Sequence, residues 1–132
     1  MDQSIIESTL AGSETLVRFK AGETLFREGD EPRGVLVVRS GQIDLIFSAR
    51  NGDAKALRVA QPGQILGMSC LVTDRPHDCT ATARTAGEAG FVRRADFMRT
   101  LDQCPAVWFS VLRVLSNDIN AAYDDIRALV AR

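Results

Sequence analysis

The pattern of hydrophobic and polar positions changes twice along the chain and divides it into three parts. In the first part, apolar residues recur at helical spacing between residues 5 and 10, and Ser4 is placed to cap that helix, with Glu7 three residues later. The spacing predicts a short amphipathic helix that ends near Gly12, within an N-terminal segment of residues 1–16.

The second part, residues 17–92, is made of short runs of β-branched and aromatic residues separated by turns. Glycine-containing turns divide these runs, and Asn51-Gly52 suits the tip of a hairpin because both residues tolerate positive φ. Such closely spaced strands predict an antiparallel sandwich or barrel. The expected strands are Val17–Phe19, Thr24–Phe26, Val35–Val38, Gln42–Ser48 and Leu57–Val59.

The third part, residues 94–132, returns to helical spacing. We expect one helix over Ala95–Gln103 and a longer one after Pro105, whose missing N–H is harmless in a first turn. Apolar residues of the longer helix follow alternating steps of four and three, as in a coiled-coil seam. This spacing favours a homodimer through the C-terminal helix, although a helix packed on its own domain is the alternative. The seam consists of Trp108, Leu112, Leu115, Ile119, Ala122, Ile126 and Leu129.

Composition narrows the class of protein. A chain of 132 residues with 45% hydrophobic residues fits one globular domain, residues 1–132. The net charge of −1 argues against nucleic-acid binding by this chain alone, and we expect no DNA-binding domain within it. The sequence contains neither an export signal nor a long apolar run, so we expect a cytoplasmic protein that does not enter a membrane. No nucleophile and base are paired in a motif, so we do not expect an enzyme.

The cysteines and the single histidine suggest little metal or redox chemistry. The three cysteines lack Cys-x-x-Cys spacing, and one histidine cannot build a metal site, so we expect no bound metal. Cys70 and Cys79 could form a redox pair, but small cysteines packed as apolar residues are the favoured interpretation.

Three segments in order carry a family resemblance. Lys20–Asp30 has a glycine turn, a Leu-Phe pair and a closing Gly-Asp; Val35–Leu45 and Pro62–Gly67 follow it. Together they resemble the cyclic-nucleotide-binding domain family, and in particular the sensor domain of bacterial catabolite-activator-type transcription regulators. The resemblance implies a mainly β fold, an antiparallel jelly roll with a short N-terminal helix and a long C-terminal dimerisation helix.

The family holds the phosphate of its ligand in a cassette, here residues 63–83, that joins a short helix to a following strand. Leu66–Leu71 matches the helix and Pro76–Ala81 matches the strand. The resemblance therefore implies a cyclic nucleotide of the cAMP or cGMP type as ligand. The residues that it places in the site are Gly67, Met68, Ser69, His77, Asp78, Cys79 and Thr80, with Asn120 added from the long helix.

The cassette departs from the family at three positions. Met68 replaces the Glu that binds the ribose, His77 replaces the Arg that binds the phosphate, and Asp78 adds a negative charge. Losing one charge-assisted contact costs about 1.5 to 3 kcal/mol. Two functions follow: a dimeric sensor in which a small anionic ligand, cyclic nucleotide or another, controls helix packing, or a ligand-free dimerisation and docking module.

Overall fold

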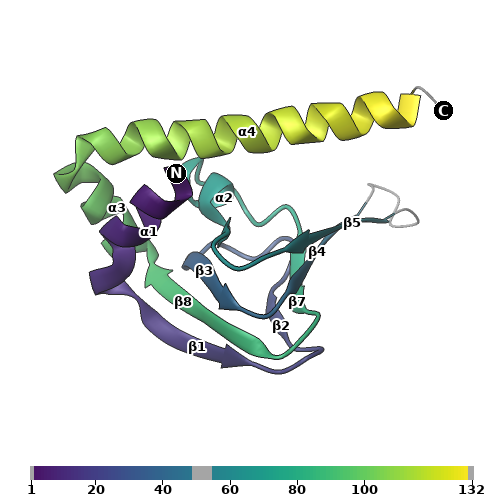
Figure 1. Ribbon diagram of the computed structural model, residues 1–132, viewed down its shortest axis with the longest axis horizontal. Coiled ribbons are helices and arrows are strands. Elements are labelled where there is room, and N and C mark those ends of the chain that lie inside the picture. Colours follow the sequence, from purple (N-terminus) through teal and green to yellow (C-terminus); the bar gives the residue numbers. More distant parts are fainter. Residues whose placement is uncertain (1, 49–54, 131–132) are drawn as a thin grey trace.

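The computed structural model describes residues 2–48 and 55–130, an antiparallel β structure with helices at both ends (Figure 1). The helices are α1 (Asp2–Leu10), the 3-10 helix η1 (Ala11–Ser13), α2 (Met68–Val72), α3 (Arg94–Gln103) and α4 (Pro105–Val130). The strands are β1 (Thr15–Phe19), β2 (Thr24–Phe26), β3 (Gly34–Ser40), β4 (Ile43–Ser48), β5 (Lys55–Ala60), β6 (Ile65–Leu66), β7 (Thr80–Ala83) and β8 (Gly87–Arg93).

The described strands form two four-stranded antiparallel sheets. The order is β1-β8-β3-β6 in one sheet and β2-β7-β4-β5 in the other, so neighbours in space are often distant in sequence. Both sheets place alternate side chains in the layer between them. This arrangement confirms the predicted jelly-roll class, and all five expected strands are present. The predicted hairpin tip at Asn51-Gly52 lies outside the described residues.

Strand β3 contributes to two separate hydrophobic cores because successive side chains of a strand point to opposite faces. Leu36 and Val38 lie in the core between the sheets, together with Phe19 and Ile43. Val35 faces the other way, into a core formed with the helices.

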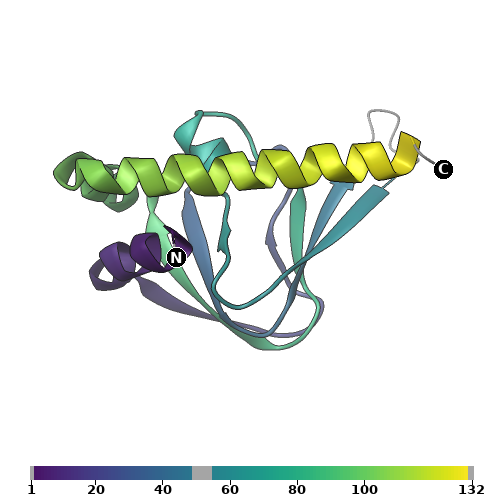
Figure 2. The same ribbon diagram turned by 45° about the horizontal axis from the view of Figure 1, so that its top comes forward.

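The helical core covers the outer face of the β1-β8-β3-β6 sheet. It contains Ile6 of α1, Leu71 of α2, Phe97 of α3 and Val111 of α4, all buried. Figure 2 shows α4 crossing the molecule with the strands beneath it, and α1 beside its N-terminal half. The helices therefore form a layer that is held to the β structure through β3 and β8.

Helix α1 starts earlier than the sequence pattern suggests. It begins at Asp2, so Ser4 lies inside the helix and the expected cap at Ser4 is wrong. The predicted end near Gly12 agrees with η1, which ends at Ser13.

Helix α4 presents a mixed face along its first turns. Trp108 and Leu115 of the predicted dimer seam are half-buried against the helical core of this same chain. Leu112, by contrast, is 57% exposed, and the neighbouring Phe109 is 66% exposed. The side chains of Ile119, Ala122, Ile126 and Leu129 lie outside the described residues.

Among the described helices, including α4, we find none long and apolar enough to cross a membrane.

Candidate functional site

The cassette begins with a tight turn into α2. Gly67 precedes the helix with φ of 85°, a left-handed conformation that favours glycine. A side chain at this position would also approach the next half of the cassette, since a Cβ on Gly67 would lie 3.1 Å from Cε1 of His77. The glycine therefore lets the two halves of the cassette pack closely.

His77 is buried and is held on both sides of its backbone by the loop between β2 and β3. Its N–H donates to the carbonyl of Asp30 at 2.9 Å, and its carbonyl accepts from the N–H of Gly29 at 2.8 Å. Its ring stacks on Phe26, with 3.9 Å between the ring centroids and 16° between the planes. These contacts fix the imidazole at the edge of the layer between the sheets.

The ring of His77 lines a cavity of about 660 Å³ between the two sheets. Ligand pockets in proteins typically have volumes of about 300 to 1,000 Å³, so the space suits a small organic molecule. Its walls combine apolar side chains of the strands with His77 and with charged side chains of the β2–β3 loop and of the start of α3. The lining residues are Val17, Leu25, Phe26, Asp30, Glu31, Pro32, Arg33, Gly34, Leu36, Leu66, His77, Phe91 and Arg94.

The imidazole of His77 makes no hydrogen bond to the residues that the structure describes. The residue is only 6% exposed and lines the cavity, and no fully enclosed side-chain nitrogen or oxygen among those residues lacks a partner, so its nitrogens keep some accessible surface. Burial lowers the pKa of His77, and the carboxylates of Asp30 and Asp78 oppose that effect only partly. The cavity is thus lined by a neutral imidazole with an unused donor and acceptor.

Arg94 connects the cavity to both the cassette and the helices. It is the first residue of α3 and lines the cavity, and its guanidinium lies 2.8 Å from the carboxylate of Asp74 in the cassette turn. Its backbone N–H donates to the carbonyl of Arg33 at 2.9 Å. A change in the cavity that moves Arg94 would therefore reach α3 directly.

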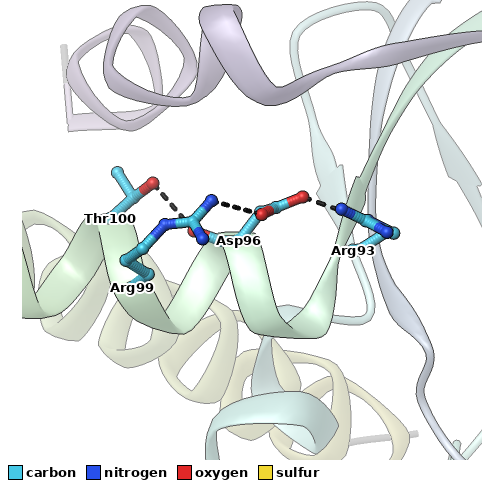
Figure 3. Close-up of polar contacts among 4 residues, drawn as sticks. All are labelled: Arg93, Asp96, Arg99 and Thr100. Carbon is cyan, nitrogen blue, oxygen red and sulfur yellow. Dashed lines mark hydrogen bonds and ion pairs between the residues drawn. The ribbon is translucent and has the colours of Figure 1, made fainter.

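The start of α3 is braced by a second charged group (Figure 3). Asp96 is only 8% exposed and accepts hydrogen bonds from Arg93, at 3.1 Å, and from Arg99. The hydrogen bond from Arg93 is the main cause that holds the pKa of Asp96 below its usual value. Because Asp96 lies in the first turn, its charge also suits the helix dipole.

Of the described residues predicted for the site, His77 alone is among those that line the cavity. Met68 is 2% exposed and packs in the helical core, so its side chain does not occupy a ligand position. The carbonyl of Ser69 accepts from the hydroxyl of Thr73 at 2.7 Å, at the C-terminal end of α2. Thr80 accepts a hydrogen bond from the N–H of Glu28 at 3.0 Å. These three contacts are structural.

Asp78, Cys70 and Cys79 form a small cluster where the two halves of the cassette meet. Burial, together with the charges of Asp78 and Cys70, raises the pKa of Cys79 to about 12. Burial also raises the pKa of Cys70. Both thiols are thus held protonated, and the exposed Asp78 contributes to raising the pKa of each. The side chain of Asn120 lies outside the described residues.

The sequence profile of the cyclic nucleotide-binding domain matches residues 16–104. The chain belongs to the cyclic nucleotide-binding domain family. This confirms the resemblance inferred from the opening hairpin and the cassette, and residues 16–104 take in the cassette, the cavity and α3.

Two curated relatives show where such a domain occurs. The chain is 26% identical over 125 residues to the HTH-type transcriptional regulator Cmr of Mycobacterium tuberculosis, covering 95% of this chain and 51% of Cmr. It is 22% identical over 111 residues to the lysophospholipase NTE1 of Kluyveromyces lactis, covering 80% of this chain and 8% of NTE1. The chain therefore spans about half the length of the regulator and a small part of the lysophospholipase.

The fold also agrees with a solved structure. The crystal structure of the Thermus thermophilus catabolite activator protein superposes with a TM-score of 0.79 at 18% identity, covering 98% of this chain and 59% of that one. The likeness extends beyond the β sheets, so the flanking helices belong to the shared architecture.

Sequence reasoning placed His77 in the site but missed Arg33 and Arg94. Arg33 follows Pro32 in a loop and Arg94 starts a helix, and neither belongs to a recognisable motif. The register Gly34↔Arg93, by which β3 and β8 pair, brings these two segments together. Only this long-range pairing reveals that the two arginines border the same cavity, because about 60 residues separate them along the chain.

Within the described ranges 2–48 and 55–130, we find no group of three or more His, Cys, Asp or Glu that could hold a metal ion.

Proposed function

We propose that residues 1–132 form a non-enzymatic cytoplasmic sensor domain of a catabolite-activator-type regulator. A small anionic ligand, of the cyclic-nucleotide type or another, would enter the cavity between the sheets and change the packing of α3 and α4. The observation that carries this proposal is the cavity lined by the buried, unpartnered imidazole of His77. Family membership supports the sensor role.

The route from ligand to output runs through Arg94. A ligand that contacts this guanidinium competes with Asp74, which now lies 2.8 Å from it. Loss of that ion pair frees the first turn of α3 from the cassette, while Asp96 keeps the turn helical. Because α4 follows α3 after Cys104, a small shift of α3 changes the direction of α4.

We further propose that two copies of the chain pair through α4. The exposed Leu112 and the heptad spacing that continues from it support this assembly. Sedimentation velocity tests it: the unchanged chain should sediment as a dimer, whereas Leu112→Asp should sediment as a monomer. Asn117→Asp, an exposed position turned away from Leu112 on the helix, is the matched control and should remain dimeric.

Hydrogen exchange tests the sensor role. Cyclic AMP, cyclic GMP and cyclic di-GMP, each added at millimolar concentration, serve as the first probes, and small organic anions follow. A ligand that fills the cavity should change amide exchange in β3 and in the first turns of α3 and α4. Protection confined to an exposed surface, or no change with any probe, would contradict the proposal.

The second candidate is a ligand-free dimerisation module. Its support is Met68, which packs in the helical core at the position where the family binds ribose. It predicts a dimer that no small molecule stabilises, so the same two measurements separate it from the sensor.

A further inference from the structure

We infer that the preferred ligand of the cavity is a small aromatic carboxylate rather than a cyclic nucleotide, an inference that rests on the proposed sensor function. It depends on which polar groups the cavity offers and which it lacks.

The walls of the cavity suit a flat apolar body. Phe26 and Phe91 bring aromatic side chains from opposite sheets, and Leu36 and Leu66 add apolar contacts from β3 and β6. Aromatic pairs favour stacked or edge-to-face contacts, so an aromatic ligand gains more from these walls than an aliphatic one.

The sugar of a nucleotide would find little to bind. The ribose position of the cassette is Met68, whose side chain is buried among the helices, away from the cavity. Apart from the charged border, His77 supplies the polar side chain of the lining. A buried hydroxyl without a partner lowers affinity about 5- to 150-fold, so the cavity selects against ribose.

The negative charge of the ligand has a candidate partner at the border of the cavity. Arg33 is exposed, and its guanidinium has no ion pair or hydrogen bond among the residues that the structure describes. Arg94 also lines the border but is already paired with Asp74. Arg33 can therefore bind a carboxylate without breaking an ion pair, whereas a ligand that also contacts Arg94 must displace Asp74. A guanidinium binds a carboxylate with two parallel hydrogen bonds.

The acidic residues of the border limit the negative charge that a ligand of the cavity can carry. The carboxylate of Asp30 accepts a hydrogen bond from the backbone N–H of Arg27 at 3.2 Å, within the turn. Glu31 is exposed at the border and opposes an anion weakly. Repulsion from Asp30 and Glu31 therefore disfavours a singly charged carboxylate beside Arg33 less than a doubly charged phosphate monoester. The neutral imidazole of His77 offers its N–H to the same molecule.

The test uses biphenyl-4-carboxylate, its neutral analogue biphenyl-4-carboxamide, and cyclic AMP, each titrated into the full chain by calorimetry. The carboxylate should bind at least about tenfold more tightly than the amide, as expected for a charge-assisted pair. Arg33→Gln should reduce this preference to about twofold while the amide binds as before. Arg27→Gln, an exposed arginine of the same loop outside the cavity lining, is the control and should keep the full preference.

A second variant, His77→Phe, keeps a ring against Phe26 and removes the hydrogen-bonding nitrogens. It should weaken the carboxylate about three- to tenfold. Equal affinity for carboxylate and amide, or a preference that survives Arg33→Gln, would overturn the inference. If cyclic AMP binds in the cavity and the biphenyl compounds do not, the inferred ligand class is wrong, whereas the proposed sensor function is retained. If no compound binds, the proposed sensor function fails as well.

Discussion

The imidazole of His77 lies flat against the ring of Phe26, with 3.9 Å between the two centroids. This stack closes one side of the cavity and joins the second half of the cassette to β2. It also places an ionisable ring in an apolar layer, where a positive charge is costly.

The stack predicts a pH dependence of stability. Because burial lowers the pKa of His77 below 6.5, the unfolded chain binds a proton that the folded chain resists. The contribution is fully present above pH 6.5 and is lost as the pH falls below that value. We expect the free energy of unfolding to drop by up to about 1.4 kcal/mol per pH unit between pH 6.5 and the lower folded pKa.

Urea denaturation between pH 7.5 and 5.5 measures this slope, and His77→Phe should flatten it. The chain has one histidine, so no second imidazole contributes in this range. An equal slope in both proteins would show that the ring is not protonated on unfolding in this range.

The cysteines predict selective labelling. Cys104, between α3 and α4, is exposed, whereas Cys70 and Cys79 are buried and hold raised pKa values. Since the thiolate is the reactive form, iodoacetamide at pH 8 should modify one thiol of the native protein quickly and all three in denaturant. Mass spectrometry counts the additions. Cys104→Ser should leave the native protein almost unlabelled, and rapid modification of Cys79 would contradict its burial.

Gly34 predicts a site of steric intolerance. A Cβ there would overlap the backbone carbonyl of Val92 and lie 2.8 Å from ring carbons of Phe91. Neither the paired strand nor the packed ring can move away freely, so Gly34→Ala should destabilise the fold by about 1 to 3 kcal/mol. Gly12→Ala is the control because nothing lies within 4 Å of its Cβ position, and it should change stability by less than about 1 kcal/mol. Equal chemical denaturation midpoints would refute the clash.

Asp96 predicts a charge effect at the start of α3. Since its pKa is held below 3.8 in the folded chain, the stabilisation is present above that value and is lost as the pH falls through the folded pKa. Asp96→Asn should lower the melting temperature at pH 7, and the difference from the unchanged chain should shrink toward pH 3. Asp102→Asn, an exposed acid of the same helix, is the control and should melt like the unchanged chain. A difference that stays constant with pH would assign the effect to packing.

The sequence predicted the elements better than it predicted the site. Local turn chemistry and period-two alternation are enough to locate strands such as Thr24–Phe26, because these signals lie within a few residues. The direction of a side chain in the folded protein is a different matter. Met68 aligns with a ligand-binding position, yet a thioether gains more from burial in the helical core. Arg33 and Arg94 come together only when β3 pairs with β8.

The two faces of β3 place the cavity and the helical core in contact with the same strand. Leu36 touches the ligand space and Val35, its neighbour in the chain, touches the helices. A displacement of β3 caused by a ligand in the cavity therefore moves side chains of the helical core directly, since both faces belong to one strand. Mutations that loosen the packing of β3 against the helical core should reduce the change that a ligand causes in the helices while leaving ligand binding intact.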